Sequence, residues 1–478
     1  DWFSPNSTPE DFMAFLKTSI LSFLIFLLSS SAAWALDPIP GEERFSALAS
    51  EEQTAGAMLG YTTIEGEHFL SITPRLDLNL GLVGLGLQIP LNIRSPIPTD
   101  NGDDSKDFGG WIRHDDWDGQ WEWLKMIRYV RLGAKRDPFY LRVGELAADL
   151  GHGTVMSRYL NNLDANSFRL GVQFDVNTQY GGAETIINDF GGNLDSKSTN
   201  SQIIGGRLYI KPMAFVDPES VLNIFAVGLT AVTDRNAPFT KTKDNGDEVS
   251  DSKSQTVWGI DVEAVVLNNA LLELVPYSDL NFISGAGSGW HLGVMAKAKL
   301  PVGLDLQLPI RLEYRNMQGG YTPTYFSTFY DIERFSYPGS DKASQSYYFQ
   351  EDQADAKGLQ GYYGDLAFDF VGLVQIGAFY EDYFGEGYSP NLAVFVSVPA
   401  LEIVQFKAYY ERRGLSGLSD AFVLDEKSYA VAEGRYELFT SIYLVAQAQQ
   451  RWADDDLDGV YEAADPEYSF GLEASLSF

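Results

Sequence analysis

The most concentrated metal-ligand pattern in the sequence is the acidic stretch DDDLDGVYEAAD, residues 454–465. Asp454, Asp456 and Asp458 alternate, a glycine follows them, and Asp465 occupies the twelfth position of the stretch. Carboxylate oxygens at every second residue, followed by a glycine that permits a sharp turn, can surround one calcium ion. Helix-flanked calcium loops carry a bidentate glutamate at the twelfth position, so this stretch is either a weak calcium loop or a solvated acidic turn. The sequence indicates no other cofactor.

The four histidines show no catalytic spacing. They are His68, His114, His152 and His291. The chain contains no cysteine, which excludes disulfides, thiolate metal sites and a cysteine nucleophile. We therefore do not expect an enzyme, and a hydrolase assembled from residues on separate strands is kept as an alternative.

Charged residues form a second set, because they recur on the polar side of segments in which apolar and polar residues alternate. If those segments are the strands of a barrel, these residues face its interior. The candidate pore-lining residues are Arg75, Arg94, Arg169, Asp175, Arg207, Lys211, Lys297, Lys299, Arg311, Glu313, Arg315, Lys407, Arg413 and Arg451. An arginine-rich wall would favour anions in a hydrated pore, whereas charges that pair with one another would only solvate a wide interior.

Aromatic residues are most frequent between residues 319 and 356, with Tyr325, Phe326, Phe329 and Tyr330 near the centre of that segment. Such a loop could fold into a channel, narrow it and stack against sugar rings. Our expectation is the more ordinary one, a loop that packs on itself outside. The stretch 144–162 interrupts the alternation, and it could be an inward-folded segment, a gate or merely a loop.

The elements that must position these residues are long alternating segments. In residues 304–315, leucine and isoleucine side chains fall on one face and charged or amide side chains on the other. A period of two is that of a strand with one apolar and one polar face. The segments are longer than the strands of about 5–6 residues in globular domains, and they match the ~10-residue segments of transmembrane barrels. Pro74, Pro90 and Pro309 predict bulges or strand ends, because proline cannot donate to a ladder.

The links between segments provide an independent indication. About twenty segments follow one another from residue 54, or sixteen to eighteen if weak ones merge, and short links alternate with long polar ones. This alternation is typical of barrels with short periplasmic turns and long outer loops. The predicted fold class is therefore all-β, a transmembrane antiparallel up-and-down β-barrel of about twenty strands. A barrel of that size has room for an aqueous channel.

The N-terminal region has the features of an export signal. From Met13 the sequence reads MAFLKTSILSFLIFLLSSSAAWA, with one lysine, a nine-residue apolar run and small residues before residue 36. These features predict a signal peptide over residues 13–35, because the apolar run is too short to span a bilayer. We expect residues 1–12 to reflect a translation start assigned too early, 36–53 to form a short periplasmic segment and 54–478 to form the barrel. A net charge of -32 argues against a nucleic-acid partner.

The signal peptide, the strand series and the closing sequence FGLEASLSF together resemble the outer-membrane β-barrel proteins of Gram-negative bacteria. The resemblance is one of architecture over residues 54–478 and includes no motif of a particular barrel family. It implies Sec-type export, contact with outer-membrane lipids and recognition of the C-terminal strand, which ends on Phe478, by the barrel-assembly machinery. It leaves open whether the protein is a monomer or a homo-oligomer.

Two functions follow from this resemblance. The first is a porin-like channel for the passive diffusion of small hydrophilic solutes, with a preference for anions. The alternative is a structural or adhesion-type surface barrel that has no channel and presents its extracellular loops.

Overall fold

The computed structural model describes residues 54–477 with internal gaps. The gaps are 65–66, 96–110, 114–115, 118–121, 136, 163–168, 195–199, 245–246, 302–304, 329, 335–357, 371–372, 385–389, 399–402, 416, 418, 420, 426–427, 451, 454–461 and 464–466. Several predictions from the sequence therefore lie outside the described residues. These are the segments 1–12, 13–35 and 36–53, together with Phe329, Arg451, Asp454, Asp456, Asp458, Asp465 and Phe478.

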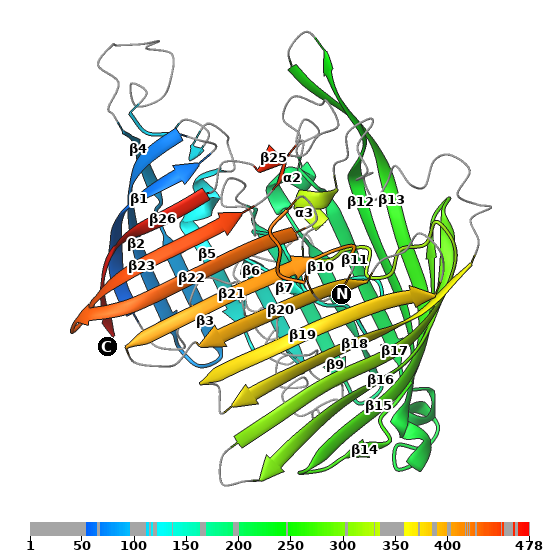
Figure 1. Cartoon of the computed structure of the whole chain (residues 1–478). Helices are drawn as coiled ribbons and strands as arrows, with labels where there is room; N and C mark the ends of the chain where they lie inside the picture. The colour runs from blue at the N-terminus through cyan, green and yellow to red at the C-terminus, as the bar shows by residue number, and fades with distance from the viewer. Residues whose placement is uncertain are drawn as a thin grey trace, which may run out of the picture.

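The described strands form one closed antiparallel wall in which each strand pairs with the next along the chain (Figure 1). Its strands are β1 (Thr54–Ile64), β2 (Glu67–Asn79), β3 (Val83–Gln88), β4 (Leu91–Arg94), β5 (Ile127–Leu132), β6 (Phe139–Gly144), β9 (Gly171–Thr178), β10 (Gly181–Ile187), β11 (Ile203–Ile210), β12 (Phe225–Asp244), β13 (Asp247–Ala264), β14 (Leu267–Asn268), β15 (Leu272–Ile283), β16 (Gly287–Pro301), β17 (Asp305–Gly319), β18 (Leu359–Phe370), β19 (Val374–Phe384), β20 (Asn391–Val398), β21 (Val404–Arg412), β22 (Ser428–Phe439), β23 (Ile442–Gln450) and β26 (Glu467–Ser477). The wall closes because β1 pairs with β26 as well as with β2.

The predicted strand number is confirmed. The pieces β3 and β4 both pair with β2, and β13 and β14 both pair with β15, so each of these two pairs of pieces counts as one strand of the wall. The described residues therefore form a closed barrel of 20 strands.

Short elements outside the wall complete the described structure. They are β7 (Ala147–Ala148), β8 (Tyr159–Leu160), β24 (Trp452–Ala453), β25 (Glu462–Ala463), α2 (Phe190–Leu194), α3 (Tyr330–Glu333), and the 3-10 turns η3 (Glu122–Met126), η4 (Pro212–Phe215) and η5 (Val221–Ile224). No helix among the described residues combines the length and apolar character needed to cross a bilayer.

Pro74, Pro90 and Pro309 coincide with interruptions of the ladder, as predicted. Pro90 lies between β3 and β4, and Pro74 is opposite Ile89 in the same interruption, where its carbonyl accepts the Ile89 N–H at 3.0 Å. Pro309 lies where the pairing of β17 with β18 omits two residues, between Gln307 and Ile310. Proline supplies no N–H to the neighbouring strand, so it is tolerated at such positions.

The two faces of the wall are reversed relative to a soluble protein. Large apolar side chains such as Leu208, Leu229 and Leu366 are exposed on the outside, whereas Arg207 and Asp365, next to two of them in the sequence, are buried inside. Hydrocarbon is the solvent that such an outer face requires, and closure leaves no unpaired strand edge within it. The wall therefore has the polarity of a transmembrane barrel.

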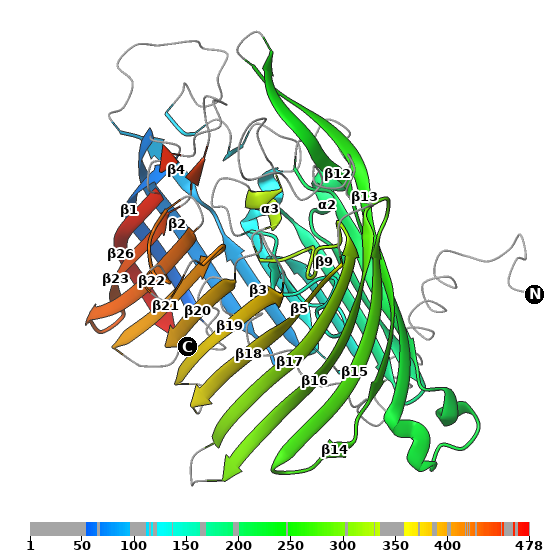
Figure 2. The same cartoon turned by 45° about the vertical axis from the view of Figure 1, so that its right-hand side comes forward.

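The two ends of the barrel differ. The links at 80–82, 133–138, 179–180 and 440–441 are short and meet at one end, whereas the long links 95–126, 145–170 and 320–358 leave from the other. The hairpin of β12 and β13 rises at this second end beyond its neighbours (Figures 1 and 2), because β11 pairs with β12 only as far as Asp234. Long loops are extracellular in barrels of this type, so we call this end the extracellular end.

This polarity gives a first prediction. Leu366 lies in the middle of β18 and is exposed on the outer face, so a charged residue at this position should destabilise the barrel. Leu366→Arg should lower the free energy of folding into lipid vesicles by about 2–4 kcal/mol, because an arginine near the bilayer midplane must be desolvated. Urea titrations followed by tryptophan fluorescence would measure this. Leu366→Met is the matched control, and equal stability of the two variants would contradict the assignment of this face to lipid.

Candidate functional site

Two segments that leave the extracellular end fold back into the barrel. We call residues 145–162 the inner hairpin, because β7 pairs with β8 within it, and we call the described residues of 320–334 the inner loop. Met156 and Phe326 form an isolated parallel bridge between the two segments. The Phe326 N–H donates to the Val155 carbonyl at 3.1 Å, and the Ser157 N–H donates to the Phe326 carbonyl at 3.2 Å. The two segments are therefore one hydrogen-bonded unit.

An apolar cluster holds this unit inside the wall. Tyr325, Phe326 and Tyr330 of the inner loop are 1%, 0% and 1% exposed and pack with Met156 and Tyr159 of the inner hairpin. The cluster includes inward-facing residues at or next to the extracellular ends of the strands, namely Ile186, Ile203, Val232, Val257, Ile283, Met317 and Tyr383. The expectation that this loop packs outside is therefore wrong for its described residues, because the apolar inner rim gives its aromatic side chains a place to be buried.

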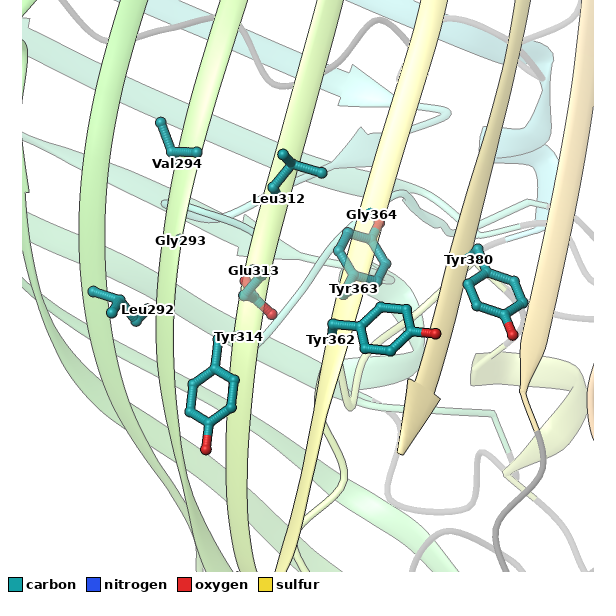
Figure 3. Close-up of a pocket in the computed structure, with 10 residues that line it drawn as sticks. All are labelled: Leu292, Gly293, Val294, Leu312, Glu313, Tyr314, Tyr362, Tyr363, Gly364 and Tyr380. Carbon is teal, nitrogen blue, oxygen red and sulfur yellow. The ribbon is translucent and has the colours of Figure 1, made fainter. Parts of the chain in front are cut away.

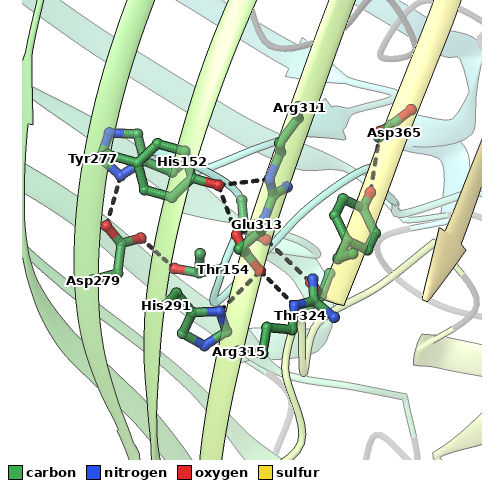
Figure 4. A network of polar contacts seen from close by, with 12 residues as sticks. His152, Thr154, Tyr277, Asp279, His291, Arg311, Glu313, Arg315, Thr324 and Asp365 are labelled. Carbon is green, nitrogen blue, oxygen red and sulfur yellow. Dashed lines mark hydrogen bonds and ion pairs between the residues drawn. The ribbon is translucent and has the colours of Figure 1, made fainter. Parts of the chain in front are cut away.

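His152 attaches the inner hairpin to the wall (Figure 4). Its Nδ1 lies 2.8 Å from Asp279 Oδ1 on β15, and its Nε2 lies 2.7 Å from Glu263 Oε2 on β13. The ring stacks on Tyr277 with 4.1 Å between centroids, and the Thr154 hydroxyl donates to the second oxygen of Asp279 at 2.6 Å. Burial disfavours the charged ring, but the two carboxylates outweigh that effect and raise the pKa of His152 to about 10. The ring is thus an imidazolium that donates from both nitrogens.

Arg207 on β11 is a second cation beside the carboxylates around His152. Its Nη2 and Nε donate to the two carboxylate oxygens of Asp261 at 2.5 and 3.0 Å, and its Nη2 lies 3.5 Å from Glu263. One ligand atom from each of His152, Asp261 and Glu263 lies within 4.8 Å of the others, a spacing that could hold a metal ion. The guanidinium and the imidazolium offset two of the three carboxylate charges of Asp261, Glu263 and Asp279.

Glu313 is the centre of a second network (Figure 4). Its Oε2 accepts from Tyr277 at 2.7 Å and from Arg311 at 2.8 Å, and its Oε1 accepts from Arg315 and lies 2.9 Å from His291 Nδ1. These side chains come from β15, β16 and β17, and all are buried. Tyr277 also stacks on His152, so the two networks are in contact.

Further pairs attach the outer part of the same unit. Arg158 lies over the ring of Phe379 at 4.2 Å and reaches Asp365 Oδ2 at 3.4 Å. Asp331 of the inner loop pairs with Arg169 at 3.1 Å and accepts from the Tyr159 hydroxyl at 2.6 Å. The unit is therefore held by residues that range from Arg169, just before β9, to Asp365 on β18 and Phe379 on β19.

The wall from β22 through β26 and β1 to β6 has a different character. Its inward arginines Arg75 and Arg142 are half-buried, in contrast to the fully buried Arg311 and Arg315, but Arg128 on β5 is fully buried and donates to Asp77. Arg435 pairs with Glu473 at 2.8 Å, and its side chain is 12% exposed.

Glu145, at the start of the inner hairpin, projects toward this second wall. Burial raises the pKa of its carboxyl group, and the nearby Arg128, Arg142 and Arg75 act in the opposite direction. Glu145 is therefore an acid among three arginines in the interior on this side.

The predicted pore-lining residues are distributed among these environments. Asp175, Arg207, Lys211, Lys297, Arg311, Glu313, Arg315 and Lys407 are buried at inward-facing positions, and Arg169 is buried in the contact with the inner loop. Arg94 and Arg413 form partly exposed pairs with Glu67 and Glu411 near the extracellular end. The side chain of Lys299 is not described. That any of them contacts permeating water stays a prediction.

Several residues of the site were not predicted, among them Asp279, Glu263 and Tyr277. Asp279 and Glu263 meet His152 across 127 and 111 residues of chain, so no local motif joins them. The sequence did contain one signal. Val232, Val257 and Met317 are apolar residues on the otherwise polar faces of their strands, and each lies near the extracellular end.

Comparisons with known proteins complete the description. No family model and no curated protein matches the chain. Among solved structures, the Pseudomonas aeruginosa protein OccK11 (OpdR) is 11% identical, with 90% of this chain and 96% of that chain covered and a TM-score of 0.33. The Escherichia coli protein Wzi, described as a carbohydrate-binding β-barrel of capsule assembly, is 11% identical over 91% and 87% of the two chains, with a TM-score of 0.34. Similarities this weak do not support a function for this chain, and its fold is established by the strand pairing itself.

Proposed function

We propose that this protein is an outer-membrane channel for the passive diffusion of small hydrophilic solutes, with a preference for anions. The observation that supports this most directly is the asymmetry of the interior. The inner hairpin and inner loop are bound to the wall from β9 to β19, where the wall charges are buried in ion pairs. On the opposite wall Arg128 is also buried, in a pair with Asp77, but Arg75 and Arg142 stay half-buried. A constriction bound to one side of a wide barrel narrows the lumen without filling it.

The path would follow the wall from β22 to β6. Arg75, Arg142 and Arg435 would contact the solute there, and Glu145 would be the principal acid on the facing side. Fixed positive charges along a narrow hydrated path attract anions and repel cations. Selectivity should therefore depend on this wall rather than on the paired arginines beneath the inner hairpin.

Planar bilayer recordings test both statements. The purified barrel should give unitary current steps, and its reversal potential in a salt gradient should indicate anion preference. Arg75→Glu should shift that potential toward cation preference, because a fixed charge of the opposite sign then faces the path. Arg235→Glu, on the exposed outer side of β12, is the control and should leave the potential unchanged. A folded barrel without current steps would rule out a channel.

The β12–β13 hairpin favours a second candidate function, that of a surface barrel that presents its loops. Residues from Ala237 to Lys253 pair only with each other and extend beyond the neighbouring strands (Figure 2). An exposed two-stranded ribbon offers unpaired strand edges to a partner. Deletion of residues 238–252 should abolish cell-surface attachment if this is the function, and it should leave unitary conductance intact if the channel is the function.

A further inference from the structure

A groove of about 500 Å³ crosses the outer face of the barrel, on the side opposite to the networks described above (Figure 3). Two rows of side chains on β16 to β19 form it. In one row Tyr314 is opposite Tyr362, and in the other Leu312 is opposite Gly364, which in turn is opposite Tyr380. The volume falls in the range of about 300–1,000 Å³ that is usual for ligand sites.

Gly364 creates the groove, and the fold does not require a glycine there. A Cβ at this position would meet only Leu312 Cδ2, at an ordinary contact distance of 3.5 Å. The neighbouring inward glycines differ, because a Cβ at Gly293 would come within 2.3 Å of Tyr277, and one at Gly377 within 2.0 Å of Phe395. The missing side chain at Gly364 leaves the backbone of β18 open to a molecule on the outer face.

One end of the groove is polar although it faces the membrane. The hydroxyl groups of Tyr362 and Tyr380 lie 3.3 and 3.4 Å from Asp382 Oδ2, and the Tyr383 N–H donates to Asp382 Oδ1 at 2.8 Å. An ionised carboxylate has about four lone-pair sites. The three described donors leave one site for a donor from outside the protein. A hydroxyl group of a lipid bound in the groove could supply that donor.

We propose that the groove binds one acyl chain of lipopolysaccharide, with the 3-hydroxyl group of that chain donating to Asp382. The groove opens to the hydrocarbon at the middle of β17 and β18, and its tyrosine end, with Tyr314, Tyr362 and Tyr380, extends from there toward the extracellular end. In a Gram-negative outer membrane the lipid of that leaflet is lipopolysaccharide. Its hydroxylated chains combine an apolar body with a hydroxyl donor, whereas ordinary phospholipid chains carry no donor. The inference goes beyond channel function and depends only on an outer-membrane location.

Lipid retention tests the inference. The barrel would be purified from outer membranes, exchanged repeatedly into detergent and analysed by native mass spectrometry, with chemical quantification of 3-hydroxy fatty acids. The wild-type protein should retain one lipopolysaccharide molecule per barrel. Gly364→Leu should lose it, because its side chain fills the groove without meeting the backbone. Asp382→Asn should retain less lipopolysaccharide and should lose the preference for hydroxylated over plain chains.

Gly434→Leu is the matched control. Gly434 lies on β22, where a Cβ would meet only Phe406 Cδ2 at 3.9 Å, so this position also has room for a side chain. It should retain lipid like the wild type. Equal retention by Gly364→Leu and wild type, preferential retention of phospholipid, or a second copy of the barrel in place of lipid would each overturn the inference. Unitary currents recorded on the same samples test the channel separately. A barrel that retains no lipid but conducts would contradict only this inference, and one that retains lipid but does not conduct would contradict only the channel function.

Discussion

Glu313→Gln should be among the most destabilising single substitutions in this barrel. The carboxylate is fully buried, it is the shared partner of Arg311 and Arg315, and it is hydrogen-bonded to His291. Removing its charge leaves the buried Arg311 and Arg315 without this partner, although Arg315 keeps Glu381, and loss of one partner from a buried ion pair typically costs about 3–5 kcal/mol. The free energy of unfolding in lipid vesicles, measured by denaturant titration, should fall by about that amount.

Two comparisons separate this effect from a general loss of charge. Glu67→Gln removes the acid of the Arg94 pair, whose side chains are 52% and 35% exposed, and it should cost no more than about 1 kcal/mol. The double variant Glu313→Gln with Arg311→Met should recover part of the loss, because it removes one of the unpaired cations. If Glu313→Gln and Glu67→Gln were equally stable, Glu313 would not be the centre of the network.

The second large effect concerns pH, and it depends on His152. Its pKa is raised in the folded barrel from 6.5 to about 10, so the protonated ring stabilises the folded arrangement. That stabilisation is fully present below pH 6.5, decreases between 6.5 and about 10, and is lost above. Within that interval each pH unit changes the ratio of attached to detached inner hairpin by up to about tenfold. We therefore expect constant unitary conductance from pH 5 to 7 and a rise as pH approaches 10.

His152→Phe provides the test of that assignment. Phenylalanine keeps a ring to stack on Tyr277 but donates to neither Asp279 nor Glu263. The variant should show the higher conductance already at pH 7 and no further step near pH 10. A step of the same size in the variant would mean that tyrosine or lysine side chains titrate instead, and the role of His152 as an anchor would then be wrong.

The wall of the barrel was predictable because a strand in a membrane has a simple sequence code. Alternation with period two assigns each residue to one face, as Leu304 to Arg315 illustrate, and proline marks the interruptions. The face on which a strand residue lies follows from its position within that strand, whichever residues it contacts elsewhere in the chain. This is why the strand number and the positions of Pro74, Pro90 and Pro309 relative to the ladder could be inferred from residues alone.

The contents of the barrel were not predictable in the same way. Whether an inward charge meets water or a partner depends on segments far away in the chain, as His152 with Asp279 shows. The inner hairpin was identified only as a failure of alternation. The apolar positions Val232, Val257 and Met317 on polar faces would have indicated that something apolar lies against the inner rim, and the aromatic residues of 319–356 were the matching surface.

The position of the closing seam has a consequence for the order of assembly. The first and last strands join along Thr54–Thr62 and Ser469–Ser477, whereas the hydrogen bonds of the inner hairpin reach β10, β13, β15 and β18. The hairpin can therefore be enclosed by a curling, still open sheet before the ends of that sheet meet. Pairing of β1 with β26 is then a late step, because it removes the last two unpaired strand edges of the sheet. A chain truncated before β26 should still bind its inner hairpin, but the unpaired edge of β1 should make it prone to aggregation.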